Sequence, residues 1–277
     1  MREFADINLR KEGGKPLMAD VFLPEGKGPF AAVVCCHGFK GFKDWGFFPL
    51  LPAPFTAAGL AVINFDFSCN GTKPGSKEIS DLEAFSQNSI HQELEDLQVV
   101  IDWIREGEMR NEFRSADTCL LGHSMGGGIA LLQAARDRSI ARLALWNSVS
   151  DWDIFMQQWD AEKWKANGFV EVVNSRTGAV YPLAYACYED YANNRNSNHL
   201  GQAAEKMEIT LLLVNGDSDQ IVTPEASEYF FKRVFHAVYI QVEGGDHTFG
   251  VRHPANAAAH YPAFSEAVEN TVAFFTD

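Results

Sequence analysis

The chain has 277 residues, of which 46% are hydrophobic and 22% charged, and its formal net charge is −14. This composition excludes a disordered chain, because that much apolar surface offsets the entropy lost on folding. The acidic balance and the lack of a basic run argue against a nucleic acid or an anionic membrane as partner, since both are bound through Lys and Arg.

Short apolar runs alternate along the chain with longer amphipathic stretches. In chain order the pattern predicts a strand over 17–23, a strand over 30–36, a helix over 47–58, a strand over 60–67 and a helix over 91–106. It then predicts a strand over 118–121, a helix over 125–135, strands over 141–146 and 209–215, a helix over 224–235, a strand over 237–242 and a closing helix over 257–275. Most of the strands are continuously apolar, which indicates burial on both faces. The sequence therefore predicts an α/β fold with a mainly parallel sheet flanked by helices.

One long stretch, residues 150–206, breaks this alternation. It lies between two predicted strands and is too long for an ordinary connection. It carries nine aromatic residues: Trp152, Phe155, Trp159, Trp164, Phe169, Tyr181, Tyr185, Tyr188 and Tyr191. We therefore expect a core formed by 1–149 and 207–277, with 150–206 inserted as a cap over the carboxyl edge of the sheet.

The strongest local motif is Gly122-His123-Ser124-Met125-Gly126-Gly127. It follows an apolar strand and precedes a helix rich in Gly and Ala, which is the strand–turn–helix context of a nucleophile elbow. Ser124 needs a turn so tight that side chains two positions away on either side would clash, and Gly122 and Gly126 remove them. The motif predicts Ser124 as a nucleophile; the alternative is a tight turn without chemistry.

A serine hydroxyl needs a base, and the base needs a group that orients it. Both follow in the chain order Ser, Asp, His: Asp217 and Asp219 lie beyond one predicted strand, and His247 lies beyond the next. We expect His247 to be the base and favour Asp219 over Asp217 as the orienting acid, because Ile221 and Val222 can anchor its loop. Asp246 is expected to be solvated or to cap its own loop.

An oxyanion hole needs two backbone donors. The N–H of Met125 follows the nucleophile, and the second donor is expected in the loop His37-Gly38-Phe39-Lys40-Gly41, where Phe39 N–H is the candidate. A plain Gly-rich turn is the alternative reading of this loop. His37 is expected to buttress the loop and His123 to pack locally. Lys40 and Lys43 either attract an anionic substrate or are simply solvated.

Other classes of site find little support in the sequence. The remaining histidines show no metal-ligand spacing, and no phosphate-binding or dinucleotide-binding motif is present, so we expect no metal and no cofactor. The N-terminus lacks the apolar run of a signal peptide, and no apolar run approaches the about 20 residues that span a bilayer. The five cysteines resemble buried hydrophobic residues of a reducing compartment. A cytoplasmic protein is expected, and a homodimer is left open.

Taken together, the motifs around Gly38, Ser124, Asp219 and His247 resemble the α/β-hydrolase superfamily. Within it the chain is similar to bacterial feruloyl and cinnamoyl esterases and to hydrolases of the prolyl oligopeptidase type, except that Lys40 stands where such esterases often have a small polar residue. The resemblance implies an eight-stranded, mostly parallel sheet and a cofactor-free, two-step acyl transfer.

The expected reaction is hydrolysis of a small-molecule ester. Aromatic residues of the cap suggest an apolar or aromatic substrate group, with Trp152, Trp159 and Tyr185 as candidate contacts; alternatively, these aromatics form the cap's own core. Two other functions stay open: a peptidase or amidase with the same triad, and a non-catalytic ligand-binding protein on this fold.

Overall fold

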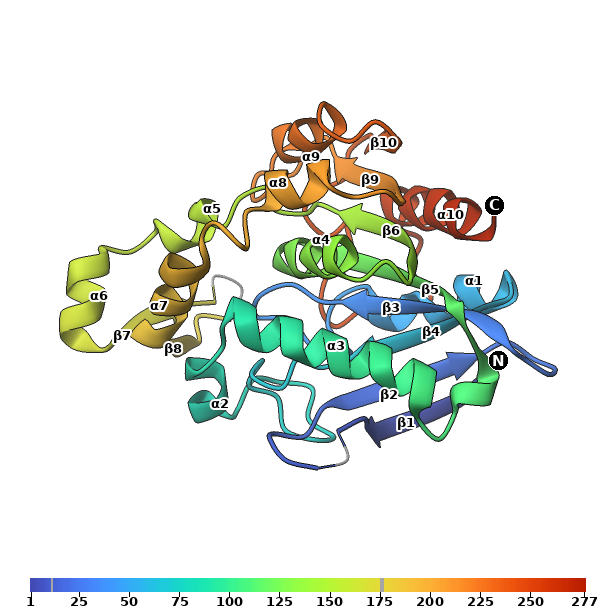
Figure 1. The fold of residues 1–277 in the computed structure, drawn as a ribbon, viewed down its shortest axis with the longest axis horizontal. Coiled ribbons are helices and arrows are strands. Elements are labelled where there is room, and N and C mark those ends of the chain that lie inside the picture. The colour runs from blue at the N-terminus through green and yellow to red at the C-terminus, as the bar shows by residue number, and fades with distance from the viewer. Residues whose placement is uncertain (11, 175–176) are drawn as a thin grey trace.

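A computed structural model describes residues 1–10, 12–174 and 177–277 of the chain. Eight strands form one sheet in the order β1-β2-β4-β3-β5-β6-β9-β10 (Figure 1). Their bounds are β1 (Arg2–Asn8), β2 (Met18–Leu23), β3 (Phe30–Cys36), β4 (Leu60–Phe65), β5 (Phe113–His123), β6 (Ile140–Trp146), β9 (Thr210–Gly216) and β10 (Ala237–Val242).

The six strands from β4 to β10 in this order are parallel to one another, whereas β2 is antiparallel to both β1 and β4. This confirms the predicted mostly parallel sheet. The sequence does not predict strand β1, because REFADIN contains no continuous apolar run. The strand lies at the edge of the sheet, and most of its residues are exposed.

Helices cover both faces of the sheet. They are α1 (Pro52–Ala57), α2 (Leu82–Ser86), α3 (Ile90–Glu106), α4 (Met125–Arg136), α5 (Asp153–Met156), α6 (Ala161–Asn167), α7 (Tyr185–Asn194), α8 (Leu200–Glu205), α9 (Pro224–Phe231) and α10 (Pro262–Thr276). Helices α3, α4, α8 and α9 share one apolar cluster with the sheet, and α1 and α10 share the other. In β3, Val33 and Cys35 belong to the second cluster and Val34 and Cys36 to the first, which explains why the run is continuously apolar.

Three predicted helices differ clearly from the observed ones: the helix predicted over 224–235 ends at Phe231, and proline accounts for the other two. The stretch 47–58 contains three prolines, which lack the N–H that a helix interior needs, and it divides into a 3₁₀ turn at Phe48–Leu50 and the short α1. The closing helix α10 begins at Pro262 instead of residue 257 because the residue before a proline, Tyr261, disfavours helical backbone (φ −123°, ψ 88°).

The stretch 150–206, called the insert below, connects β6 to β9. It contains α5, α6, α7, α8 and an antiparallel pair, β7 (Phe169–Val173) and β8 (Val180–Ala184). All of these except α8 lie beyond the carboxyl ends of the parallel strands, on the left of Figure 1. Helix α8 packs instead against α4 and α9, and so helps to cover the sheet. In the described part of the chain, no helix has the length and apolar character needed to cross a membrane.

Candidate active site

The turn between β5 and α4 holds Ser124 in a conformation that few residues adopt, with φ 57° and ψ −125°. Close backbone packing around this turn requires glycine. A β-carbon on Gly122 would lie 2.6 Å from the Gly127 α-carbon, and one on Gly126 would lie 2.2 Å from the His37 carbonyl oxygen. The geometry is that of a nucleophile elbow, with the Ser124 hydroxyl at the N-terminus of α4.

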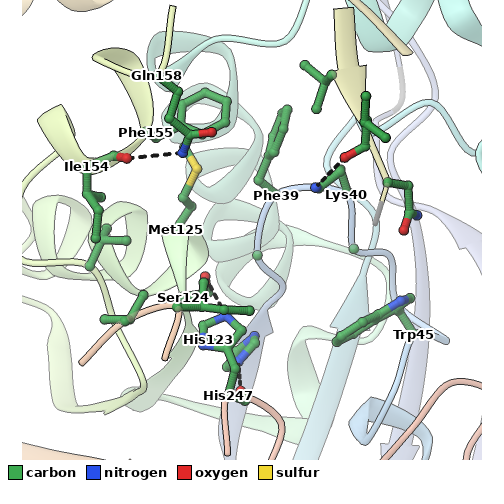
Figure 2. Close-up of a pocket in the computed structure, with 18 of the residues that line it drawn as sticks. Phe39, Lys40, Trp45, His123, Ser124, Met125, Ile154, Phe155, Gln158 and His247 are labelled. Carbon is green, nitrogen blue, oxygen red and sulfur yellow. Dashed lines mark hydrogen bonds between the residues drawn. The ribbon is translucent and has the colours of Figure 1, made fainter. Parts of the chain in front are cut away.

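Three predicted residues from distant parts of the chain meet at this edge of the sheet. His247 Nε2 lies 3.1 Å from Ser124 Oγ, and His247 Nδ1 lies 2.7 Å from Asp219 Oδ2. Figure 2 shows the first of these bonds. Asp219 is 3% exposed, and its Oδ1 accepts hydrogen bonds from the N–H groups of Ile221 and Val222 at 2.8 and 3.0 Å. The acid is therefore fixed by its own loop while its second oxygen faces the imidazole.

The two neighbouring carboxylates have other partners. Asp217 Oδ1 accepts a bond from Gly244 N–H at 2.8 Å, which joins the loop after β9 to the loop after β10. Asp246 Oδ1 accepts from the N–H groups of Thr248 and Gly250 at 2.9 and 2.8 Å, so this residue caps the turn that follows His247. Of the three carboxylates, Asp219 is the one that contacts the imidazole.

The loop after β3 passes directly over the serine. A β-carbon on Gly38 would lie 2.9 Å from Ser124 Cβ and 3.4 Å from its Oγ, so only glycine fits there without movement. The turn is closed by a bond from Gly41 N–H to the Gly38 carbonyl at 2.9 Å, with Lys40 at φ 62°. This brings Phe39 to the cavity that Ser124 and Met125 also line. Phe39 and Met125, the two predicted oxyanion donors, thus both lie beside the serine.

His37 lies beneath this loop and is neutral, because burial lowers the pKa of its imidazole to about 4. Its Nδ1–H donates to the Gly38 carbonyl at 3.0 Å, and its Nε2 accepts from Phe67 N–H at 3.2 Å. The ring thus links the loop to the strand end of β4, in the position expected of a buttress.

The two lysines of this region behave differently. Lys43 is buried, and its ammonium contacts Asp20 Oδ2 at 2.6 Å and Asp44 Oδ2 at 3.0 Å. Both predictions for Lys43 are wrong: because its charge is paired inside the protein, the residue is neither solvated nor available to attract a substrate. Lys40 does line the cavity, where its ammonium donates to the Val173 carbonyl at 3.3 Å (Figure 2).

A cavity of about 470 Å³ opens above Ser124, between the sheet edge and the insert. Its apolar lining comprises Phe39, Trp45, Met125, Val149, Ile154, Phe155, Trp159, Val172, Val173, Ile221 and Val222. Its polar lining, apart from Ser124 and the two histidines His123 and His247, comprises Lys40, Gln158, Glu171 and Asn174. In the described part of the chain, no group of three or more His, Cys, Asp or Glu side chains is arranged to hold a metal ion.

Of the three aromatic residues expected to contact substrate, only Trp159 is among the described residues that line the cavity. The Trp152 ring lies against Gly128 of α4, and its Nε1–H donates to the Asn198 carbonyl at 2.8 Å. Tyr185 packs with Trp164 and Tyr188 inside the insert. Sequence reasoning missed Trp45, whose signal was its place four residues beyond Gly41 in the loop that crosses the serine.

Comparison with known proteins agrees with this architecture. The family model described as alpha/beta hydrolase family matches residues 33–260. Among curated proteins, a monoacylglycerol lipase of Mycolicibacterium smegmatis is 30% identical over 125 residues, covering 45% of this chain and 39% of that protein. The 2,6-dihydropseudooxynicotine hydrolase of Paenarthrobacter nicotinovorans is 29% identical over 150 residues, covering 54% of this chain and 35% of that protein. The matched regions thus span less than half of these relatives.

Solved structures resemble the whole chain more evenly. Est1E from Butyrivibrio proteoclasticus superposes with a TM-score of 0.72 at 17% identity, covering 98% of this chain and 99% of that one. Est1E with ferulic acid bound gives a TM-score of 0.70 at 20% identity, covering 94% and 95%. At such identities the likeness shows the fold. Since the family model spans most of the sequence, the chain belongs to the alpha/beta hydrolase family.

Proposed function

We propose that this protein is a serine hydrolase that cleaves carboxylic esters through an acyl-enzyme, with Ser124 as nucleophile, His247 as general base and Asp219 as the acid that orients it. The observation that carries the proposal is the continuous relay from Asp219 Oδ2 through the imidazole to Ser124 Oγ, with contacts of 2.7 and 3.1 Å. Both distances are within hydrogen-bonding reach, which is the geometric requirement for a nucleophile activated by a base.

In the first half-reaction, neutral His247 takes the Ser124 proton at Nε2 as Oγ attacks the ester carbonyl carbon. The Nδ1–H group keeps its bond to Asp219, which stabilises the imidazolium that forms. Collapse of the tetrahedral intermediate breaks the bond to the alkoxy oxygen, and that oxygen receives the proton from Nε2. In the second half, water gives a proton to Nε2 as its oxygen attacks the acyl carbon. Collapse of the second tetrahedral intermediate breaks the bond from the acyl carbon to Ser124 Oγ, which takes that proton back from Nε2, and the acid and free Ser124 are released.

The negative charge on the intermediate needs donors near Ser124. We assign this role to the backbone N–H groups of Phe39 and Met125, because both residues flank the serine in the cavity and Met125 opens α4. The N-terminus of a helix adds a favourable field for an anion at this point. Loss of one such donor costs on the order of 3 kcal/mol of transition-state stabilisation.

The cavity supports a small substrate with an apolar or aromatic group. Its volume of about 470 Å³ lies within the range of small-molecule sites, and five large apolar side chains stand around the serine: Phe39, Met125, Ile154, Phe155 and Trp159. The similarity in fold to Est1E, for which a complex with ferulic acid is known, adds support for an aromatic acid as the acyl part.

The direct test is Ser124→Ala, assayed by hydrolysis of p-nitrophenyl acetate and by labelling with a fluorophosphonate probe. We expect the variant to fold, to lose labelling, and to lose turnover by about 10⁶-fold or to the detection limit. Ser115→Ala is the matched control, because Ser115 is exposed on the same strand at the opposite end from the elbow. Turnover by Ser124→Ala at the wild-type rate would exclude the proposed nucleophile.

A panel of p-nitrophenyl, alkyl and feruloyl esters then tests the acyl group. Higher kcat/KM for the feruloyl ester than for the acetyl ester is expected if the aromatic side chains bind the acid. Equal values would argue against an aromatic acyl site. Hydrolysis of aminoacyl anilides in preference to all esters would favour the peptidase or amidase alternative.

A further inference from the structure

The main-chain carbonyl of His247 is held by two side chains that come from neighbouring strand ends. His123, the last residue of β5, donates from Nε2 to this oxygen at 2.8 Å, as Figure 2 shows. Asn147, the first residue after β6, donates from Nδ2 to the same oxygen at 3.1 Å and to the Asp246 carbonyl at 3.2 Å. The peptide that carries the base is therefore fixed from below by two independent donors.

The other side of the Asn147 amide reaches the loop that carries the acid. Its Oδ1 accepts a hydrogen bond from Gly216 N–H at 2.9 Å, and Gly216 is the last residue of β9. The loop with Asp219 starts at the next residue. One side chain thus bonds both the loop that holds the acid and the loop that holds the base.

The backbone of Asn147 is suited to this role. The residue is completely buried, its N–H donates to the Val214 carbonyl at 2.9 Å, and its φ is +46°. Asn is one of the few non-glycine residues that adopt this left-handed conformation at small cost. The amide has its donor end at two carbonyls and its acceptor end at an N–H, so a flipped amide would leave both ends mismatched.

The ring of His123 is committed to the same support. It lies between the Phe47 ring, at a centroid distance of 5.0 Å, and the His247 ring, at 4.8 Å. Its Nε2 is engaged by the His247 carbonyl, so this nitrogen supports the residue that carries the base.

From these contacts we propose that Asn147, assisted by His123, is a positioning residue that holds the His247 imidazole in line between Asp219 and Ser124. The proposal rests on the proposed function of the triad. A base loop released from these bonds would let the imidazole drift, and a misplacement of about 1 Å at a reacting group costs on the order of 10²-fold in rate.

The test compares two substitutions of Asn to Asp. Asn147→Asp keeps the shape, the tolerance for positive φ and the acceptor for Gly216 N–H, but removes the donor to the His247 carbonyl. Asn64→Asp is the matched control: Asn64 is also buried on the sheet, and its Nδ2 donates to the Phe48 carbonyl at 3.0 Å, a contact outside the relay. Both variants are measured at pH 8 with p-nitrophenyl acetate.

We expect Asn147→Asp to lower kcat by about 10- to 100-fold with KM changed less than about threefold, because binding residues are untouched. The control should lose thermal stability but keep its kcat. If Asn147→Asp keeps kcat within about twofold of the wild type, or raises KM alone, the inference is wrong although the proposed function stands.

A second variant covers the case in which Asn147→Asp fails to fold. His123→Phe keeps the ring against Phe47 but loses the donor, whereas His123→Gln can still donate to the His247 carbonyl. The expected order of kcat is wild type, then Gln, then Phe, and equal values for Gln and Phe would overturn the assistance assigned to His123.

A spectroscopic readout separates this inference from the proposed function. In ¹⁵N-labelled wild type, the His247 Nδ1 proton in its 2.7 Å bond to Asp219 should give a slowly exchanging downfield NMR signal, assigned by its loss in His247→Gln. The signal should broaden or vanish in Asn147→Asp and stay in Asn64→Asp. Persistence in Asn147→Asp overturns the inference even if no ester is turned over; absence of labelling at Ser124 in the wild type overturns the function instead.

Discussion

Glu93 on α3 is a buried carboxyl group that forms no salt bridge with the described residues, and it makes the stability of the fold depend on pH. The side chain is 6% exposed. Burial raises the pKa of Glu93 from 4.5 to about 8; the bond from Asn88 Nδ2 to its Oε1 at 2.9 Å acts in the opposite direction, and the nearby Asp96 adds to the rise. The carboxyl is therefore mostly protonated in the folded protein at neutral pH.

The raised pKa fixes the sign and size of the effect. Between pH 4.5 and pH 8 the folded state binds more protons at this site than the unfolded state. The contribution of the protonated Glu93 carboxyl to the stability of the fold is therefore fully present below about pH 4.5 and is lost as the pH rises through about 8. A difference of one pKa unit corresponds to about 1.4 kcal/mol, so the rise from 4.5 to about 8 corresponds to about 5 kcal/mol at pH 9.

Glu93→Gln removes this dependence while keeping the shape and the acceptor for Asn88. Urea unfolding at pH 5 and pH 9 should give similar stabilities for variant and wild type at pH 5, but a variant more stable by about 5 kcal/mol at pH 9. Glu95→Gln is the control on the same helix, because Glu95 is exposed and should change stability by less than about 0.5 kcal/mol. Equal effects of Glu93→Gln at both pH values would refute the reasoning.

The remaining predictions concern the site itself. Gly38→Ala should lower kcat about 10²-fold with little change in KM, since the new methyl group would lie 2.9 Å from Ser124 Cβ and must push away the loop that carries Phe39. The kinetics of p-nitrophenyl acetate hydrolysis measure this effect, and a kcat within threefold of the wild type would contradict the prediction. Asp219→Asn should lower kcat by about 10⁴-fold and leave the loop folded, because an amide oxygen can still accept from Ile221 N–H; a loss below tenfold would show that Asp219 does not orient His247.

The sheet and the relay were predictable because both follow from local patterns. Continuous apolar runs such as Phe30–Cys36 predict a strand buried on both faces, and the observed bounds of that strand are the same. Ser124, Asp219 and His247 each follow a predicted strand, and parallel strands bring their carboxyl ends to one edge, so chain order alone predicts that the three loops meet.

The insert was less predictable, because its aromatic residues serve two purposes that the sequence does not distinguish. Trp152 binds the insert to α4, and Tyr185 packs within the insert, whereas Trp159 lines the cavity. All three lie in one stretch whose sequence shows no periodicity that would separate an inner from an outer face. Likewise, Lys43 and its partner Asp20 are far apart in sequence, and only the folded sheet brings them together.

Backbone strain gathers at the same edge of the sheet as the relay. Among the described residues, five non-glycine residues have positive φ, and four of them lie beyond the carboxyl ends of parallel strands: Ser124 directly after β5, Asn147 directly after β6, Lys40 in the loop after β3 and Phe249 in the loop after β10. Such a conformation costs a non-glycine residue about 1–2 kcal/mol, less for asparagine, so it persists only where other bonds hold it. At Ser124 and Asn147 these bonds come from the backbone: Ser124 N–H donates to the Trp146 carbonyl at 3.1 Å, and Asn147 N–H donates to the Val214 carbonyl at 2.9 Å. The sheet thereby supports, at a cost in stability, the turns that carry the Ser124 hydroxyl and the Asn147 amide.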